Sequence, residues 1–193
     1  MFDDNTAAAP AAWREIDART RALGFDMPSE PKAGAMLRLL AASKPAGRLL
    51  ELGTGTGLAT AWLLDGMGQA ASLVSVDTDP HVQAVACAVL GDDPRLGLLI
   101  GDGLNYVRAQ PPASFDLIFA DAWPGKYDGL DETLALLRPG GLYVVDDMSP
   151  QPNWPEGHQP RVDALVARLK SHPDLVSVAL DWASGLVIAA RRS

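Results

Sequence analysis

The stretch Leu49-Leu50-Glu51-Leu52-Gly53-Thr54-Gly55-Thr56-Gly57 joins an apolar run to three alternating glycines. Residues 48–53 have the apolar composition of a strand that is buried in a parallel sheet, and residues 58–67 have the length of a helix. Glycine between them lets the backbone turn sharply and approach a ligand closely, because it carries no Cβ. The stretch therefore predicts a strand, a ligand-binding turn and a helix, which is the first unit of an α/β sheet.

Apolar runs and segments of helical length alternate along the next part of the chain. The apolar runs predict strands at 72–77, 96–101, 115–121 and 141–146. The segments between them predict helices near 80–90, 103–109 and 128–137. This alternation is typical of a parallel sheet that is covered by helices on both faces.

The two ends of the chain depart from this alternation. A helix near 160–171 precedes two apolar runs, 176–182 and 186–190, and the short turn between the runs predicts an antiparallel hairpin. Before the sheet, residues 10–23 and 31–43 have the pattern of amphipathic helices. These two helices have no strand of their own to cover, so we expect them to pack across the ligand-binding edge of the sheet.

Composition and charge limit what the chain can be. Its 193 residues suit one domain over 1–193, with an N-terminal helix or lid in 1–30 and a core in 31–193. A net charge of −8 repels phosphate backbones, so nucleic acid is not an expected partner. One cysteine, Cys87, fits a reducing compartment. Since there is neither a basic leader nor a run of about 18 apolar residues, we expect a soluble cytoplasmic protein without a membrane partner.

An acidic residue ends the second predicted strand. Asp77 lies 24 residues after Gly53, and a carboxylate there can accept both hydrogen bonds from a ribose diol. The loop differs from the dinucleotide fingerprint G-x-G-x-x-G because its third glycine comes one residue early. Glu51 also adds a negative charge close to where a dinucleotide would place its pyrophosphate. A cationic nucleoside fits better, and an NAD(P)-dependent oxidoreductase stays open as the alternative.

Residues 51–57, followed by Asp77 and Gly101-Asp102, resemble the cofactor motifs of class I S-adenosylmethionine-dependent methyltransferases. The resemblance implies a Rossmann-like three-layer α/β sandwich with a seven-stranded mixed sheet of order 3-2-1-4-5-7-6, in which strand 7 is antiparallel. It places Glu51 near the methionine end, Asp77 at the ribose and Asp102 at the adenine amine. The alternative for Asp77 and Asp102 is a helix cap. The expected cofactor contacts are Glu51, Gly53, Thr54, Gly55, Gly57, Asp77, Thr78, Gly101, Asp102, Gly103 and Asp121.

Carboxylates also end two further predicted strands. Asp121 follows the run 115–120, and Asp146 and Asp147 follow the run 142–145. If these strands are neighbours about 4.8 Å apart, their carboxyl ends bring the acids within reach of one hard cation. Successive strand residues point to opposite faces, so Asp146 and Asp147 converge only if the chain bends there.

Residues 121–127 and 139–147 are similar to segments of the cation-dependent O-methyltransferases of the catechol and caffeoyl-coenzyme A type. That resemblance implies a divalent cation such as Mg²⁺ on Asp121, Asp146 and Asp147. The sequence departs from the family at two positions, because Asp147 stands where asparagine is expected and Pro124 stands where a lysine base is expected. Lys126 could act from a shifted position, and its alternative is a solvated lysine on an exposed loop.

These features together predict methyl transfer to an oxygen of a small aromatic or hydroxylated acceptor. Asp121, Lys126 and His158 are the candidate catalytic residues, with Lys126 or His158 as the base. His158 lies in a proline-rich loop, 148–160, and Trp123 and Trp154 could form walls for a flat acceptor. A protein that binds the nucleoside without catalysis is a further alternative. Related enzymes often pair, so a homodimer is also considered.

Overall fold

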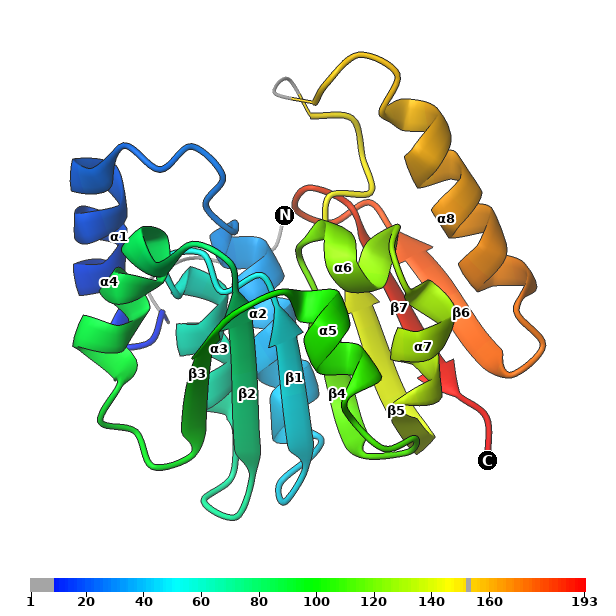
Figure 1. The fold of residues 1–193 in the computed structure, drawn as a ribbon, viewed down its shortest axis with the longest axis horizontal. Helices are drawn as coiled ribbons and strands as arrows, with labels where there is room; N and C mark the ends of the chain where they lie inside the picture. Colours follow the sequence, from blue (N-terminus) through cyan, green and yellow to red (C-terminus); the bar gives the residue numbers. More distant parts are fainter. Residues whose placement is uncertain (1–8, 152–153) are drawn as a thin grey trace, which may run out of the picture.

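The computed structural model describes residues 9–151 and 154–193 and shows one seven-stranded sheet between two layers of helices (Figure 1). The strand order is β3-β2-β1-β4-β5-β7-β6, and β7 is antiparallel to both of its neighbours. The strands are β1 (Arg48–Leu52), β2 (Ser72–Asp77), β3 (Leu96–Ile100), β4 (Phe115–Ala120), β5 (Leu137–Val145), β6 (Leu175–Leu180) and β7 (Leu186–Arg191). The expected three-layer α/β sandwich and its strand order are confirmed.

Helices cover both faces of this sheet (Figure 1). The helices are α1 (Trp13–Leu23), α2 (Pro31–Ala42), α3 (Leu58–Gly66), α4 (Pro80–Leu90), α5 (Gly103–Arg108), α6 (Trp123–Lys126), α7 (Leu130–Ala135) and α8 (Gln159–Ser171). Helices α2 and α3 share one apolar core with one face of the sheet. Helices α5, α7 and α8 share a second apolar core with the opposite face. Two stretches lie outside the described residues, namely residues 1–8 of the predicted N-terminal segment and residues 152 and 153 of the predicted loop 148–160.

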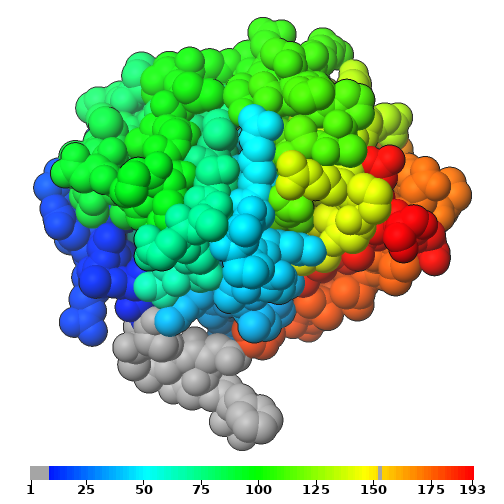
Figure 2. All heavy atoms as spheres, turned by 90° about the horizontal axis from the view of Figure 1, so that it is seen from below, coloured from blue at the N-terminus to red at the C-terminus, as the bar shows by residue number. Residues whose placement is uncertain are grey.

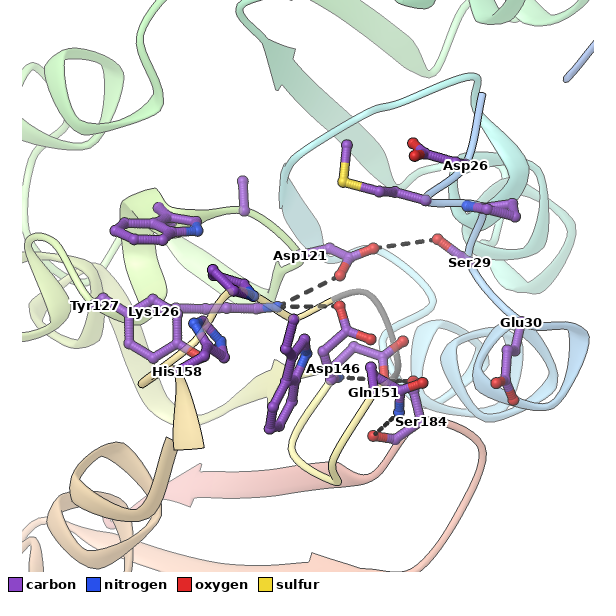
Figure 3. Close-up of a pocket in the computed structure, with 17 residues that line it drawn as sticks. Asp26, Ser29, Glu30, Asp121, Lys126, Tyr127, Asp146, Gln151, His158 and Ser184 are labelled. Atoms are coloured by element: carbon purple, nitrogen blue, oxygen red, sulfur yellow. Dashed lines mark hydrogen bonds and ion pairs between the residues drawn. The ribbon is translucent and has the colours of Figure 1, made fainter. Parts of the chain in front are cut away.

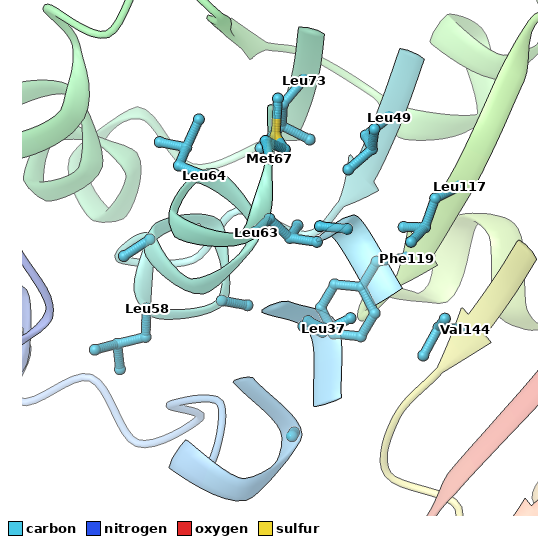
Figure 4. Packing of buried hydrophobic residues seen from close by; sticks show 14 of the residues in the cluster. Leu37, Leu49, Leu58, Leu63, Leu64, Met67, Leu73, Leu117, Phe119 and Val144 are labelled. Atoms are coloured by element: carbon cyan, nitrogen blue, oxygen red, sulfur yellow. The ribbon is translucent and has the colours of Figure 1, made fainter. Parts of the chain in front are cut away.

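Side chains along β1 alternate between the two cores, because successive strand residues point to opposite faces. Leu49 lies in the core below α2 and α3, together with Phe119 of β4, whereas Leu50 lies in the core below α5, α7 and α8. Figure 4 shows the first of these cores, in which Leu37 of α2 and Leu63 of α3 face Phe119. Burial of each such leucine contributes about 2 kcal/mol, so this packing fixes β1 and the loop that follows it.

Helix α2 packs on a face of the sheet, so the expectation that residues 31–43 cross the ligand-binding edge was wrong. Ala33, Leu37 and Ala41 lie on one side of α2 and are completely buried. A Cβ on Gly34 would lie 2.2 Å from the Trp62 side chain, so glycine permits the close approach of α2 to α3. The apolar side of α2 is thus already covered by α3 and the sheet.

Helix α1, in contrast, does reach the edge at which the parallel strands end. The Thr20 hydroxyl of α1 donates a hydrogen bond to the Thr56 hydroxyl in the glycine loop over 2.8 Å. Gly24 ends the helix in a left-handed conformation with a φ of 71°. The chain then turns back over the loop, where Phe25 packs against Gly55. Residues 24–30 therefore lie beside the glycine loop, although the two are about thirty residues apart in sequence.

Two predicted boundaries were wrong around the fourth and fifth strands. Strand β5 begins at Leu137 and not near residue 141, because Leu137 pairs with Phe115 before a register shift restores the regular ladder. The preceding helix, α7, accordingly ends at Ala135. A short helix, α6, also follows β4 where no helix was expected, and its interior residue Gly125 has a left-handed φ of 86°.

The opposite edge of the sheet carries the turns that lead into the strands, and Figure 2 views the molecule from that side. There the cyan segment near residue 45 lies beside the yellow segment near residue 140. The Lys44 ammonium donates to the Gly140 carbonyl over 2.8 Å, which joins these two turns. Among the described residues, no helix combines the length and the apolar character that crossing a membrane requires.

Candidate functional site

The glycine loop after β1 depends on left-handed backbone at all three glycines. Gly53, Gly55 and Gly57 have φ values of 99°, 53° and 94°. A Cβ on Gly57 would lie 2.7 Å from the Cβ of Ala86 in α4, which real side chains do not tolerate. All three positions therefore require glycine because of their backbone conformation, and Gly57 requires it also because α4 packs against it.

A cavity of about 420 Å³ lies over this loop, and we call it the loop cavity. Six of the residues expected to contact a cofactor line it, namely Gly53, Thr54, Gly55, Asp77, Thr78 and Asp121. At its floor, Asp77 Oδ2 accepts a hydrogen bond from the Gly55 N–H over 2.7 Å, and Oδ1 accepts one from the Asp79 N–H over 2.9 Å. Asp77 thus holds the glycine loop in shape while its carboxylate faces the cavity.

Glu51 lies behind the loop cavity and does not line it, which differs from its expected position beside the methionine group. Its side chain is completely buried, and Oε2 accepts hydrogen bonds from Thr60 at 2.6 Å and from Ser75 at 2.5 Å. Burial raises the pKa of Glu51 to about 8, since these two hydrogen bonds only partly offset the loss of water. Oε1 has no hydrogen-bond partner among the described residues.

Residues 101–103, which follow β3, were expected to contact a cofactor, but they do not line the loop cavity. The carboxylate of Asp102 caps α5 by accepting a hydrogen bond from the Asn105 N–H over 2.7 Å, and its side chain is exposed. Gly101 and Gly103 do not line the loop cavity, and neither does Gly57. Asp102 therefore caps α5, and contact of its exposed carboxylate with an adenine amine stays a prediction.

A second cavity, of about 330 Å³, contains the three acids that follow β4 and β5, and we call it the acidic cavity. Asp121, Asp146 and Asp147 line it together (Figure 3). Asp147 has a φ of 60°, so the chain bends after β5 and both neighbouring acids face the same space. Asp146 is almost completely buried and accepts hydrogen bonds from the Ser184 hydroxyl and the Asp147 N–H.

Lys126 reaches into this acidic cavity with its ammonium group. The side chain is only 5% exposed, and Nζ lies 3.5 Å from Asp121 Oδ1 and 3.8 Å from Asp147 Oδ2. Figure 3 shows Nζ pointing between the carboxylates from the α6 side of the cavity. The alternative of a solvated lysine on an exposed loop is therefore wrong, because α6 turns Lys126 inward.

Asp121 lies in the wall between the two cavities and lines both. Its Oδ2 accepts a hydrogen bond from the Ser29 hydroxyl over 3.2 Å, while Oδ1 pairs with Lys126. Burial raises the pKa of Asp121, and the Lys126 ammonium opposes that rise. Burial likewise raises the pKa of Asp146, and the Asp121 carboxylate adds to the effect. Ser29 belongs to the segment 24–30, so this segment closes one side of the junction.

Aromatic rings form the far wall of the acidic cavity. Trp123, Tyr127, Trp154 and His158 line it, and the Trp154 and His158 rings lie 4.7 Å apart. The Tyr127 hydroxyl and His158 Nε2 lie 3.1 Å apart and share a hydrogen bond. Burial raises the pKa of Tyr127 to about 12. Burial, together with the nearby cations of Lys126 and Arg161, lowers the pKa of His158, so the imidazole is neutral near pH 7.

Sequence reasoning missed three polar residues that the structure brings to the site. Ser29 follows α1, Tyr127 follows α6, and Ser184 lies in the turn between β6 and β7. Their contacts to Asp121, His158 and Asp146 join segments that are at least thirty residues apart. The sequence signals were positional: Ser29 lies in the loop 24–30, Tyr127 in the segment 121–127 and Ser184 in the short turn of the predicted hairpin.

A sequence model of the family described as "Methyltransferase domain" matches residues 50–148, from β1 to the residue after the acidic pair. The chain belongs to this methyltransferase family. Membership contradicts the alternative of an NAD(P)-dependent oxidoreductase. It also explains why the glycine loop and the acid-tipped strands β2, β4 and β5 occur together in one chain, since they lie within the matched segment.

Individual relatives agree with the family assignment. A presumed O-methyltransferase of Mycobacterium sp. (strain JLS) is 31% identical over 200 residues, which cover 98% of this methyltransferase and 88% of the relative. Another, from Mycolicibacterium vanbaalenii, is 31% identical over 149 residues that cover 75% of this chain but only 63% of the relative. The solved structure of the O-methyltransferase TomG from Streptomyces achromogenes, involved in tomaymycin synthesis and in complex with S-adenosylmethionine, has a TM-score of 0.82. TomG shares 22% identity, with 97% of this chain and 94% of TomG covered, and it shares the fold.

Proposed function

We propose that this methyltransferase transfers the methyl group of S-adenosylmethionine to an oxygen of a small hydroxylated aromatic acceptor. The observation that carries the proposal is the position of Asp121 in the shared wall of the loop cavity and the acidic cavity. A nucleoside in the first cavity and an acceptor in the second would meet at that wall. Methyl transfer needs the attacking oxygen, the methyl carbon and the sulfur in line, so adjoining cavities suit it.

The proposed cofactor contacts follow from the lining of the loop cavity. The turn Gly53–Gly55 admits the nucleoside closely, and each carboxylate oxygen of Asp77 has a further lone pair for a ribose hydroxyl. The Asp121 carboxylate adds negative charge at the junction of the two cavities, which suits a sulfonium. Asp102, at the end of β3, is the proposed contact of the adenine amine in addition to its role as a cap.

The proposed acceptor contacts are the aromatic residues of the acidic cavity. Trp123 and Trp154 give flat apolar surfaces, while the acids and Lys126 supply charge at the other end. A ring that carries a hydroxyl group fits such a cavity, because its apolar body can pack on the indoles and its oxygen can face Lys126. The cavity of about 330 Å³ matches one small ring system and not a polymer.

In this proposal His158 accepts a proton and Lys126 stabilises negative charge. An acceptor hydroxyl forms a bond to the methyl carbon through oxygen and gives up its proton. His158 is the candidate final acceptor of that proton, because the imidazole is neutral near pH 7 and its Nε2 shares a hydrogen bond with the Tyr127 hydroxyl, which lines the same cavity and relays the proton. Lys126 carries an ammonium between two carboxylates and so stabilises the developing oxyanion instead of acting as a base.

The residues of the acidic cavity do not fit a divalent cation. The argument for a metal on Asp121, Asp146 and Asp147 is that Mg²⁺ prefers carboxylate ligands. Lys126 Nζ lies between Asp121 and Asp147, however, and one oxygen of Asp146 is taken up by Ser184 and a backbone N–H. Within residues 9–151 and 154–193, no three His, Cys, Asp or Glu side chains are grouped so that they could hold a metal. We therefore derive no step through a metal.

Calorimetry with S-adenosylhomocysteine and with NAD in parallel tests the cofactor. We expect the first to bind and the second to give no heat, and failure to bind S-adenosylhomocysteine would defeat the proposal. Transfer of a labelled methyl group to a panel of phenols and catechols then tests the reaction. Binding of the nucleoside without turnover of any phenol or catechol would favour the non-catalytic alternative.

A further inference from the structure

The Lys126 ammonium lies between Asp121 and Asp147, at the position that a metal bound by these carboxylates would occupy. The turn before it is fixed from both sides, because the Tyr143 hydroxyl donates to the Gly125 carbonyl over 2.6 Å and the Gly125 N–H donates to the Asp128 carbonyl over 2.8 Å. A Cβ on Gly125 would lie 2.5 Å from Leu52, so the turn sits directly on β1. The backbone beneath Lys126 is thus as constrained as the core, which directs the side chain into the cavity.

The ammonium group uses only part of its hydrogen-bonding capacity on the protein. An ammonium has three N–H donors, and Asp121 and Asp147 are its two charged neighbours at 3.5 and 3.8 Å. Only the contact with Asp121 is a hydrogen bond, so donors are left for an oxygen in the cavity, next to the junction with the loop cavity at Asp121. A cation is therefore already present at the position where negative charge would develop on an acceptor oxygen.

A divalent ion could enter only by displacing this lysine. Mg²⁺ needs oxygens at about 2.1 Å in octahedral arrangement, and it would have to share Asp121 and Asp147 with a positive group that is 95% buried. Resting on the proposed function, we propose that the Lys126 ammonium takes the place of a divalent cation, so that methyl transfer in this protein requires no metal. Asp121 and Asp147 then serve to position the lysine.

This substitution of lysine for a metal restricts the acceptor. A divalent ion can chelate two neighbouring oxygens of one acceptor at once, whereas an ammonium donates separate hydrogen bonds and does not chelate. The protein therefore accepts aromatic compounds with one hydroxyl group and gains nothing from a second, adjacent hydroxyl. Catechols and matched monophenols are expected to turn over with kcat/KM values within about threefold of each other.

Binding of Mn²⁺, followed by electron paramagnetic resonance, tests the inference without an acceptor or a cofactor. The wild-type protein is expected to leave Mn²⁺ free in solution. Lys126→Ala and Lys126→Gln remove the ammonium and leave three carboxylates, and each is expected to bind about one equivalent of Mn²⁺. Lys126→Arg keeps the positive charge and Lys170→Met removes an exposed lysine of α8, so both are expected to leave Mn²⁺ free in solution.

Stoichiometric binding of Mn²⁺ by the wild-type protein would overturn the inference. So would a failure of both Lys126→Ala and Lys126→Gln to gain a site while their circular dichroism matches wild type. If one of the two variants does not fold, the other decides. The titration needs no nucleoside, so loss of S-adenosylhomocysteine binding in calorimetry would contradict the proposed function alone, and the two failures are distinguishable.

Turnover provides a second readout. Once a phenol that is methylated has been found, addition of a chelator should change kcat/KM less than about twofold. Lys126→Met should lower kcat by about 10²–10³-fold, as expected for loss of an oxyanion donor, while the affinity for S-adenosylhomocysteine stays within about threefold. Abolition of wild-type turnover by the chelator, with recovery on adding Mg²⁺, would contradict a role for lysine in place of metal.

Discussion

The carboxylate of Asp77 accepts a hydrogen bond from the Gly55 N–H over 2.7 Å, and this contact joins the end of β2 to the loop after β1. One side chain thus shapes the glycine loop and faces the loop cavity. If the loop cavity holds the nucleoside as proposed, Asp77 couples nucleoside binding to loop geometry, and substitution there affects both at once.

Asp77→Ala should weaken binding of S-adenosylhomocysteine by at least about 30-fold, or about 2 kcal/mol, because hydrogen bonds to a charged carboxylate are lost. Calorimetry measures the affinity directly. Asp92→Ala, which removes an exposed carboxylate after α4, is the matched control and should bind as wild type. An Asp77→Ala variant that holds the nucleoside as tightly as wild type would contradict the assigned ribose contact.

Gly57→Ala should destabilise the fold more than Gly24→Ala does. Both glycines have positive φ, so each alanine is strained by about 1–2 kcal/mol. Only at Gly57 would the added Cβ meet another residue, Ala86, at 2.7 Å, which adds about 1–3 kcal/mol of overpacking. Urea denaturation of the two variants isolates the packing contribution, and equal losses of unfolding free energy would argue against the close contact between the loop and α4.

Glu51 makes the stability of the fold depend on pH. Its pKa rises to about 8 in the folded protein, so the folded state holds a proton that the unfolded state releases near pH 4.5. This contribution to stability is complete below pH 4.5 and is lost, by up to about 1.4 kcal/mol per pH unit, as the pH rises towards 8. Glu51→Gln removes the titrating group, so urea denaturation between pH 5 and about 8.5 should show a flatter profile than wild type. Parallel profiles would be inconsistent with a raised pKa.

His158→Gln tests the proposed base. The substitution should lower kcat by about 10²–10⁴-fold because the acceptor hydroxyl loses its proton acceptor. The His158 pKa lies below its ordinary value of 6.5, and a base works only when unprotonated, so wild-type activity should fall with decreasing pH only below pH 6.5. The variant should lack this acid limb in its pH–rate profile. If His158→Gln keeps the same loss of activity at low pH, another group causes that loss.

Much of the fold follows from local patterns. The largely apolar runs before Gly53 and Asp121 predict β1 and β4, since a strand covered on both faces buries most of its side chains. The start of α4 was also readable, because Asp79 caps the helix and Pro80 is its first residue. The early start of β5 was not readable, since it depends on pairing of Leu137 with Phe115, and strand pairing leaves no mark on either segment alone.

The sequence by itself determined the order of strands and helices, the glycine loop and the acids that end β2, β4 and β5, because these depend on residues close together in the chain. Only the tertiary structure decided what those acids do. The bend at Asp147 turns its carboxylate into the acidic cavity, where it pairs with Lys126 of α6. The contact of Ser29 with Asp121 joins segments that lie 92 residues apart. Their energies depend on distance and burial, which composition and spacing do not specify.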